Sequence, residues 1–245
     1  MVTPLPSPSK QEIIYPDSDG QPMSDNTKQF RWIVTIQGGL DALFQDDPNV
    51  FVAGDLLWYP VEGDNKTRIA PDAMVVFGRP KGDRGSYQQW REDNIPPQVV
   101  FEVLSPGNTL TEMAKKLAFY DRYGVEEYYL YDPDKVDLSG WLRSKERLEV
   151  IEPIASWVSP RLGIRFDLGA EELQIYRPDG QRFATYVELA RQTEQQQQEK
   201  ELAQAVAEQE RSRAEQAEAM LAAERQRVQA LLARLRETGV DPEQL

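Results

Sequence analysis

The 245-residue sequence contains neither cysteine nor histidine. Without cysteine there are no disulfide bonds and no thiolate chemistry. Without histidine, Ser-His and Cys-His catalysis and histidine-ligated zinc are excluded. Any chemistry must therefore come from carboxylates, lysine, serine, tyrosine or backbone groups. Carboxylate sites that lack histidine and cysteine favour hard ions such as Mg²⁺ or Mn²⁺ over Zn²⁺.

Long apolar runs are also missing from the sequence. No stretch of about 18 apolar residues occurs, so no membrane-spanning helix and no membrane partner are expected. Residues 1–8 show no basic segment followed by an apolar one, so no secretory signal is expected either. Together with the absence of cysteine, these features favour a cytoplasmic location.

Positive charge is scarce, because 28 lysines and arginines face 41 acidic residues, which gives a net charge of -13. This balance argues against a broad basic surface for nucleic acid, although a local basic groove remains compatible with it. A hydrophobic content of 40% is enough for a packed interior. A chain of this length can hold one sizeable core and an appendage.

Composition divides the chain into four parts. Residues 1–22 are rich in Pro, Ser, Gly and Asp and are predicted to form an irregular arm. Residues 23–188 carry helical and strand patterns and are predicted to form the folded domain. Residues 189–238 are dominated by Ala, Gln, Glu and Arg and are predicted to be a helical tail, which a glycine and a proline within residues 239–245 bring to an end.

Apolar spacing predicts the elements of the folded domain. A first helix is expected between the capping residues 24–26 and the turn at 47–49, and a second over Thr109–Tyr123, ended by Gly124. The polar stretch 78–97 is expected to be a surface excursion. Strands are expected over residues 50–59, 69–77, 98–104, 127–131, 141–143, 147–151, 163–168 and 173–176. This order predicts an α/β fold with a mixed sheet flanked by helices.

The tail carries a heptad pattern over residues 191–237. Apolar or small residues recur every seven positions, and a companion series is interrupted at Glu210 and Glu224. The two series are Ala207, Ala214, Leu221, Val228 and Leu235, and Ala203, Ala217 and Leu231. The pattern predicts a coiled coil that is firmer toward its C-terminal half, with a second copy of the chain or another helix as partner. A solvated single helix is the alternative.

Two carboxylates stand out because each is a lone acid in an apolar segment. Asp72 lies in the predicted strand 69–77, and Glu102 lies in the predicted strand 98–104. A buried unpaired carboxylate costs several kcal/mol, so such acids are tolerated when they are paired or bind a cation. From neighbouring strands they could share one divalent ion, with the backbone carbonyl of Val103 as a further ligand. Exposure on a half-covered strand is the alternative for either acid alone.

The helix after Glu102 carries a candidate catalytic cation. Ser105 opens the turn that leads into this helix, whose apolar stripe includes Met113, Leu117 and Tyr120. At ~100° per residue, Lys116 lies beside the stripe and can reach over the sheet edge, whereas Lys115 should point to solvent. An ammonium group there can stabilise a phosphorane-like transition state. The alternative is that Lys116 pairs with Glu112.

Four motifs in order resemble the Uma2 family, a group of restriction-endonuclease-like proteins that is abundant in cyanobacteria. They are PD at 71–72, FEVLSP at 101–106, KLAFY at 116–120 and YGVEEYYLYDP at 123–133. The resemblance covers roughly residues 25–185 and implies the fold of the PD-(D/E)XK nucleases. It also implies that Asp72 and Glu102 are metal ligands.

One position departs from the nuclease motif that the resemblance implies. The motif's lysine would stand two residues after Glu102, where this chain has Leu104, and Lys116 of the following helix matches the Uma2 pattern instead. Many relatives also carry an acid or histidine in the first helix, for which the nearest candidates are Asp25, Asn26 and Gln29. Asp55 and Ser105 are possible additional site residues, and an outward strand position is the alternative for Asp55.

The sequence therefore supports two functions. The first is a Mg²⁺- or Mn²⁺-dependent endonuclease that hydrolyses DNA, with Asp72 and Glu102 holding the ion and Lys116 assisting. The second is a degenerate nuclease fold that serves as an interaction module through residues 191–237. The acids in apolar strands favour the first, whereas the net charge and Leu104 favour the second.

Overall fold

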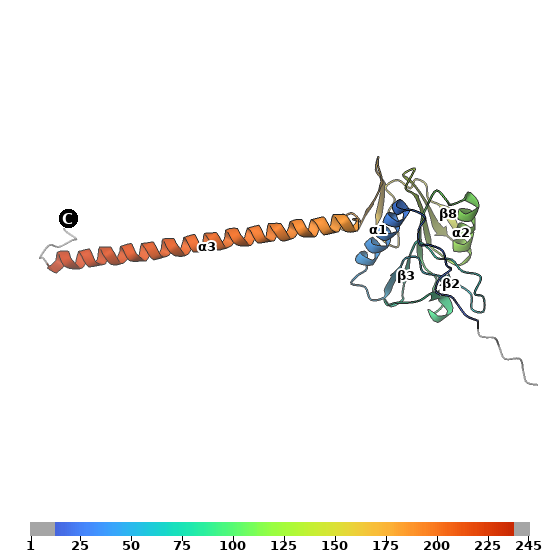
Figure 1. The fold of residues 1–245 in the computed structure, drawn as a ribbon, viewed down its shortest axis with the longest axis horizontal. Coiled ribbons are helices and arrows are strands. Elements are labelled where there is room, and N and C mark those ends of the chain that lie inside the picture. The colour runs from blue at the N-terminus through green and yellow to red at the C-terminus, as the bar shows by residue number, and fades with distance from the viewer. Residues whose placement is uncertain (1–12, 238–245) are drawn as a thin grey trace, which may run out of the picture. The chain divides into compact units, whose positions relative to one another are not determined.

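The fold is built around a six-stranded sheet whose central strands are almost continuously apolar (Figure 1). The computed structural model describes residues 13–237. In sheet order the strands are β1 (Val50–Ala53), β3 (Ala73–Phe77), β5 (Val99–Val103), β6 (Glu127–Asp132), β7 (Asp137–Ser144) and β8 (Arg147–Val150). Neighbours are antiparallel except β5 and β6, which are parallel. Parallel pairing requires a crossover, and helix α2 (Leu110–Arg122) supplies it.

A helix covers each face of this sheet (Figure 1). Helix α1 (Thr27–Leu43) packs on the face that receives the odd-numbered side chains of β3 and β5, such as Val75 and Phe101. Helix α2 packs through Tyr120 on the opposite face, which receives even-numbered side chains such as Met74 and Val100. The predicted α/β fold with a mixed sheet flanked by helices is thus confirmed, and Glu102 is placed on the α2 face.

Two predicted strands are shorter than expected because local chemistry interrupts them. The run 50–59 divides into β1 and β2 (Trp58–Tyr59), since Asp55 adopts a left-handed backbone with φ of 49°. The run 69–77 enters the sheet only at Ala73, because Pro71 has no N–H to donate to a ladder. Ile69 instead forms an isolated bridge with Trp58.

The polar stretch 78–97 is more ordered than a surface excursion. It contains β4 (Tyr87–Gln88), which pairs in parallel with β2, and the 3₁₀ helix η1 (Gln89–Arg91). The Tyr87 ring is fully buried, and its hydroxyl donates to the Ile95 carbonyl. Two further strands, β9 (Arg165–Leu168) and β10 (Leu173–Tyr176), form a hairpin; β10 has the predicted bounds, and β9 begins two residues later than predicted.

Residues from Val187 onward form a separate unit. Its helix α3 runs over Tyr186–Glu237, and Leu221, Val228 and Leu231 are exposed on it in this single chain. Within residues 13–237 no helix is long and apolar enough to cross a membrane. The side chain of Leu235, the predicted helix end in residues 239–245 and the first twelve residues of the predicted arm lie outside the described part of the chain.

Candidate active site

The sheet register brings the two predicted acids to one place. Ala73 pairs with Phe101 in the antiparallel ladder of β3 and β5, so Asp72 and Glu102 continue that register as the next opposed pair. Directly opposed residues of an antiparallel pair point to the same face. The carboxylate of Asp72 also crosses to the neighbouring strand, where its Oδ2 accepts a hydrogen bond of 2.6 Å from the Val103 N–H.

Glu102 is held by two side chains of α2. Its carboxyl group is buried, with 2% of the residue exposed. Lys116 Nζ lies 2.7 Å from Oε2, and the Tyr120 hydroxyl donates to Oε1. Lys116 and Tyr120 are four residues apart and therefore share one face of the helix. As the helical spacing predicted, Lys116 points to the sheet while Lys115 is exposed, and the ion pair of Lys116 is with Glu102 rather than with Glu112.

Negative charge is in excess around these residues. Burial, followed by the charge of Glu102, raises the pKa of Asp72 well above its ordinary value. Burial, Asp19 and Glu102 raise the pKa of Asp55. Burial alone would lower the pKa of Lys116, but the adjacent Glu102 carboxylate outweighs it and raises that pKa, so Lys116 stays charged. Three carboxylates thus share one ammonium group, which is a setting that a divalent cation would stabilise.

The start of α1 supports the site from the other side of the sheet. Gln29 donates from Nε2 to the Val103 carbonyl at 2.8 Å, and its Oε1 accepts from the Asp25 N–H at 2.8 Å. The Ser105 hydroxyl donates to the Asp25 carboxylate. Asn26 caps α1, so its side chain serves the helix. Ser105 and Gln29 therefore position Asp25 and the Val103 carbonyl.

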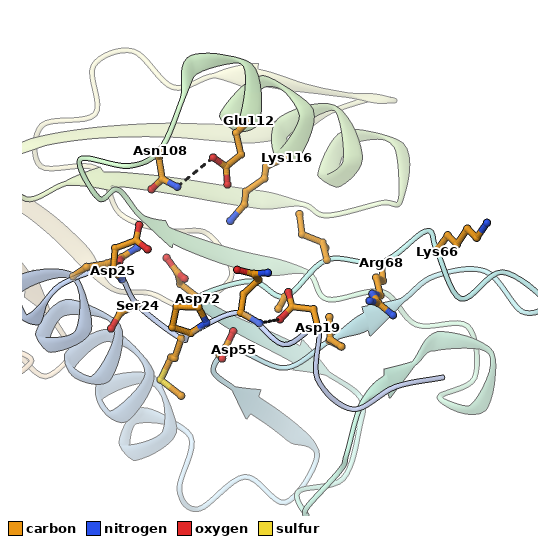
Figure 2. Close-up of a pocket in the computed structure, with 17 residues that line it drawn as sticks. Asp19, Ser24, Asp25, Asp55, Lys66, Arg68, Asp72, Asn108, Glu112 and Lys116 are labelled. Carbon is orange, nitrogen blue, oxygen red and sulfur yellow. Dashed lines mark hydrogen bonds between the residues drawn. The ribbon is translucent and has the colours of Figure 1, made fainter. Parts of the chain in front are cut away.

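Residues from these elements line a cavity of about 560 Å³ that opens to solvent (Figure 2). Its charged lining residues are Asp19, Asp25, Asp55, Asp72, Glu112, Lys66, Arg68 and Lys116. Glu102 and Val103 are not among the lining residues; Glu102 is buried, and its Oε2 accepts from Lys116, which does line the cavity. Sequence reasoning missed Asp19, Tyr120, Lys66 and Arg68. Only Tyr120 left a signal, because it stands one helical turn after Lys116.

The donor set fits a hydrated Mg²⁺ or Mn²⁺ ion. Over residues 13–237 no group of three or more acidic side chains is placed to hold a metal. Mg²⁺, however, keeps several waters and is commonly held through only one or two carboxylates. Asp72 lines the cavity, and its carboxylate accepts one hydrogen bond from the described residues, donated by Val103; each oxygen of Glu102 retains a second lone pair. The buried Tyr128 hydroxyl nearby has no hydrogen-bond partner within the described chain, which leaves a donor for a bound water.

Replacing Asp72 by asparagine tests whether the excess negative charge at the site destabilises the metal-free protein. The raised pKa of Asp72 means that its ionised form destabilises the metal-free fold, a cost that is absent at low pH and appears as pH rises through that pKa. In EDTA, Asp72→Asn is therefore expected to raise the melting temperature at neutral pH, with a gain that disappears on acidification. Added Mn²⁺ should raise the melting temperature of the wild type but not that of the variant.

The matched control for this experiment is Asp64→Asn. The pKa of Asp64 is lowered, first by the hydrogen bond from the Thr67 hydroxyl, so this substitution should lower stability at neutral pH. Two results would contradict a cation site with excess negative charge. One is a wild-type melting temperature that does not change when Mn²⁺ is added, and the other is an Asp72→Asn variant that is less stable than the wild type at neutral pH.

The family-model comparison agrees with the motifs. The model of the Uma2 family, described as "Putative restriction endonuclease", matches residues 8–161. A solved structure from Anabaena variabilis, described as "a putative nuclease belonging to DUF820", is 19% identical and covers 56% of this chain and 75% of its own, with a TM-score of 0.43. No protein of curated function matches the chain.

Proposed function

Because the chain belongs to the Uma2 family, we propose that it is a divalent-metal-dependent endonuclease that hydrolyses phosphodiester bonds of DNA. The observation that carries this proposal is the ion pair between Lys116 and Glu102, which lies next to Asp72, a carboxyl group whose pKa is raised. Two acids and a lysine at one sheet edge are the side chains that metal-assisted phosphodiester hydrolysis needs. Here the lysine comes from α2 in place of the position occupied by Leu104.

Asp72 and Glu102 would hold the ion, with the Val103 carbonyl as a further ligand oxygen. When bound, the ion supplies an activated water at neutral pH and neutralises charge on the phosphate. The ammonium of Lys116 stays protonated and stabilises negative charge that develops on the phosphate oxygens. Tyr120 donates to Glu102 and fixes its direction; burial and the Glu102 charge raise the pKa of this hydroxyl, which keeps its proton.

The supporting residues act by position. Gln29 holds the Val103 carbonyl from the α1 side, and Ser105 orients Asp25 at the cavity wall. Asp55 faces the same cavity with its pKa raised, so its carboxyl could add a ligand once a cation is present. Such partners matter because a 1 Å displacement of a reacting group can lower a rate about 100-fold.

A small chromogenic phosphodiester, bis-(p-nitrophenyl) phosphate, tests the chemistry without DNA recognition. The full chain should release nitrophenol with Mn²⁺ or Mg²⁺ and not with EDTA. Release that persists in EDTA, or that is equal in Asp72→Asn, would show that another site or a contaminant is responsible.

The second candidate function is assembly through α3 by a fold that has lost activity. The observation in its favour is the row of apolar side chains at heptad spacing, Leu221, Val228 and Leu231, which is exposed on the single helix. Such a row is typical of a helix that pairs with another helix, and the N-terminal half, where alanine fills the heptad positions, should pair more weakly. The partner we propose is a second copy of the chain or another amphipathic helix.

Removal of residues 191–245 is expected to lower the oligomeric state and to leave the globular unit folded. That unit, residues 1–186, has its own apolar core on both sides of the sheet. Light scattering should therefore show a mass loss larger than the combined mass of the segments deleted from all chains of the assembly. In the full-length chain, Leu221→Glu with Val228→Glu should have the same effect, while Met220→Glu, beside the row, should not. If the full-length and truncated proteins are both monomers, or if the truncated form unfolds, the proposed assembly role is wrong.

A further inference from the structure

A second groove, of about 410 Å³, lies beside the acidic cavity. It is formed by the loop before Ile69 and by the outer face of α2. Its lining residues are Lys66, Thr67, Arg68, Lys115, Ala118, Phe119, Arg122 and Tyr123. Four of these eight side chains are cationic and none is acidic. In a protein with a net charge of -13, such a groove is a strong local departure from the average charge.

The four cations of this basic groove are available to a ligand. None of Lys66, Arg68, Lys115 and Arg122 forms an ion pair within the described chain, whereas Arg79, Arg84 and Arg161 each do. Arg68 is positioned by neutral partners, since its Nη1 donates to the Tyr59 hydroxyl at 3.3 Å and to the Asn65 carbonyl at 3.4 Å. An unpaired cationic groove is the electrostatic feature that attracts phosphates.

Two aromatic rings stand among these cations. The Phe119 and Tyr123 rings lie 4.6 Å apart, and both meet the buried Trp58 edge-on. Both side chains are only partly buried, and the Arg122 guanidinium lies 5.5 Å from the Tyr123 ring centre. A positively charged groove with aromatic rings on which bases can stack is typical of single-stranded nucleic acid binding.

Helix α2 links this groove to the active site. Lys116 and Tyr120 face the sheet, whereas Lys115, Phe119 and Arg122, at spacings of four and three, share the outer face. Lys66 and Arg68 line both the basic groove and the cavity, so the two are adjacent and share these cations. Figure 2 shows Lys66 and Arg68 at one end of the cavity and Asp25 at the other. A polyanion would therefore enter from the basic end.

We propose that the basic groove binds a single strand of nucleic acid and leads its backbone to Lys116 and Asp72. The cleavage step rests on the proposed nuclease function, but strand binding does not. Four cations in one groove match a few phosphates of one strand. The acidic remainder of the surface disfavours the broad contact that a duplex would make.

Fluorescence anisotropy of the full-length chain in EDTA tests binding without cleavage. The probes are a labelled single strand of about 12 nucleotides, within the usual range of site sizes, and a duplex of the same sequence. The double variant Lys115→Ala, Arg122→Ala should weaken single-strand binding about tenfold. It should also reduce the salt slope, which is the slope of log K against the logarithm of the salt concentration, by about 1.4, because each lost phosphate contact removes about 0.7. The matched control, Lys81→Ala with Lys135→Ala, removes the same charge outside both the basic groove and the cavity. It should change the affinity for the single strand little.

The aromatic contribution has its own variant. Phe119→Leu keeps an apolar side chain but removes the stacking face, and it should weaken binding of the single strand without changing the salt slope. Its melting temperature is measured in parallel, and a folded variant that binds as tightly as the wild type overturns the role of the aromatic rings.

The remaining outcomes separate the groove from the chemistry. A duplex that binds as tightly as the single strand, a control pair that weakens binding equally, or affinity only for anionic lipid vesicles overturns the proposal. Strand binding that depends on Lys115 and Arg122 without any metal-dependent cleavage supports the groove and contradicts the nuclease function. If the Lys115→Ala, Arg122→Ala variant cleaves single strands with an unchanged KM, the nuclease function is supported and the role of the groove is contradicted.

Discussion

Replacing Glu102 by glutamine is expected to lower metal-dependent phosphodiester cleavage by more than about 100-fold. Substitutions of residues that merely orient a metal ligand already cost about 10- to 100-fold, so loss of a ligand charge should cost at least as much. Glutamine keeps the shape of the side chain and an oxygen that can accept from Tyr120. What it removes is the charge that would hold a cation and that pairs with Lys116.

The control for this variant is Glu112→Gln, which removes an exposed acid of helix α2 from the wall of the cavity. Its rate should stay within a few-fold of the wild type. Cleavage rates with Mn²⁺ and melting temperatures are measured for both variants. A folded Glu102→Gln protein with wild-type rates, or equal losses in both variants, would remove Glu102 from the ligand set.

Replacing Lys116 by methionine should affect both activity and stability. Loss of a group that stabilises transition-state charge typically lowers kcat about 10²- to 10³-fold. Glu102 would also be left buried without its cation, and breaking such a pair usually destabilises a protein by about 3–5 kcal/mol. The side chains are 20% and 3% exposed, so the pair is mostly shielded from solvent. Denaturant unfolding and single-turnover cleavage measure the two effects.

Two companion variants separate charge from position. Lys115→Met removes the neighbouring exposed cation and should leave the free energy of unfolding within about 0.5 kcal/mol of the wild type. Lys116→Arg keeps the charge and should restore most of the stability. Because the Lys116 charge lowers the pKa of Asp72, Lys116→Met should also shift the Asp72 titration to higher pH. A Lys116→Met protein as stable as Lys115→Met would show that the ion pair is unimportant.

The central part of this architecture could be predicted from sequence because its signals are local. Lone acids inside apolar runs marked Asp72 and Glu102, and the helical period separated Lys116 from Lys115. The interruption at Asp55 could not be predicted, because an aspartate in a left-handed conformation is selected by its surroundings. Strand β4 was missed because its two residues pair only with β2, far away in sequence.

The chemistry around the acids depended on contacts across the fold, which no local pattern reveals. Tyr120 looked like one more residue of an apolar helix stripe, yet its hydroxyl donates to Glu102. Asp19 belongs to a segment that sequence alone left irregular, yet its charge acts on Asp55. The basic groove combines residues 66–68 with residues 115–123, two segments that come together only in the folded chain.

The proposed function is hydrolysis of DNA with a divalent ion held by Asp72 and Glu102. Its most direct test is cleavage of end-labelled DNA, both single-stranded and duplex, by the purified full-length chain in Mg²⁺, in Mn²⁺ and in EDTA. We predict cleavage products with either metal, none with EDTA, and none from an Asp72→Asn, Glu102→Gln protein purified in the same way. Intact DNA under every metal condition, or cleavage that persists in the double variant, would contradict this account.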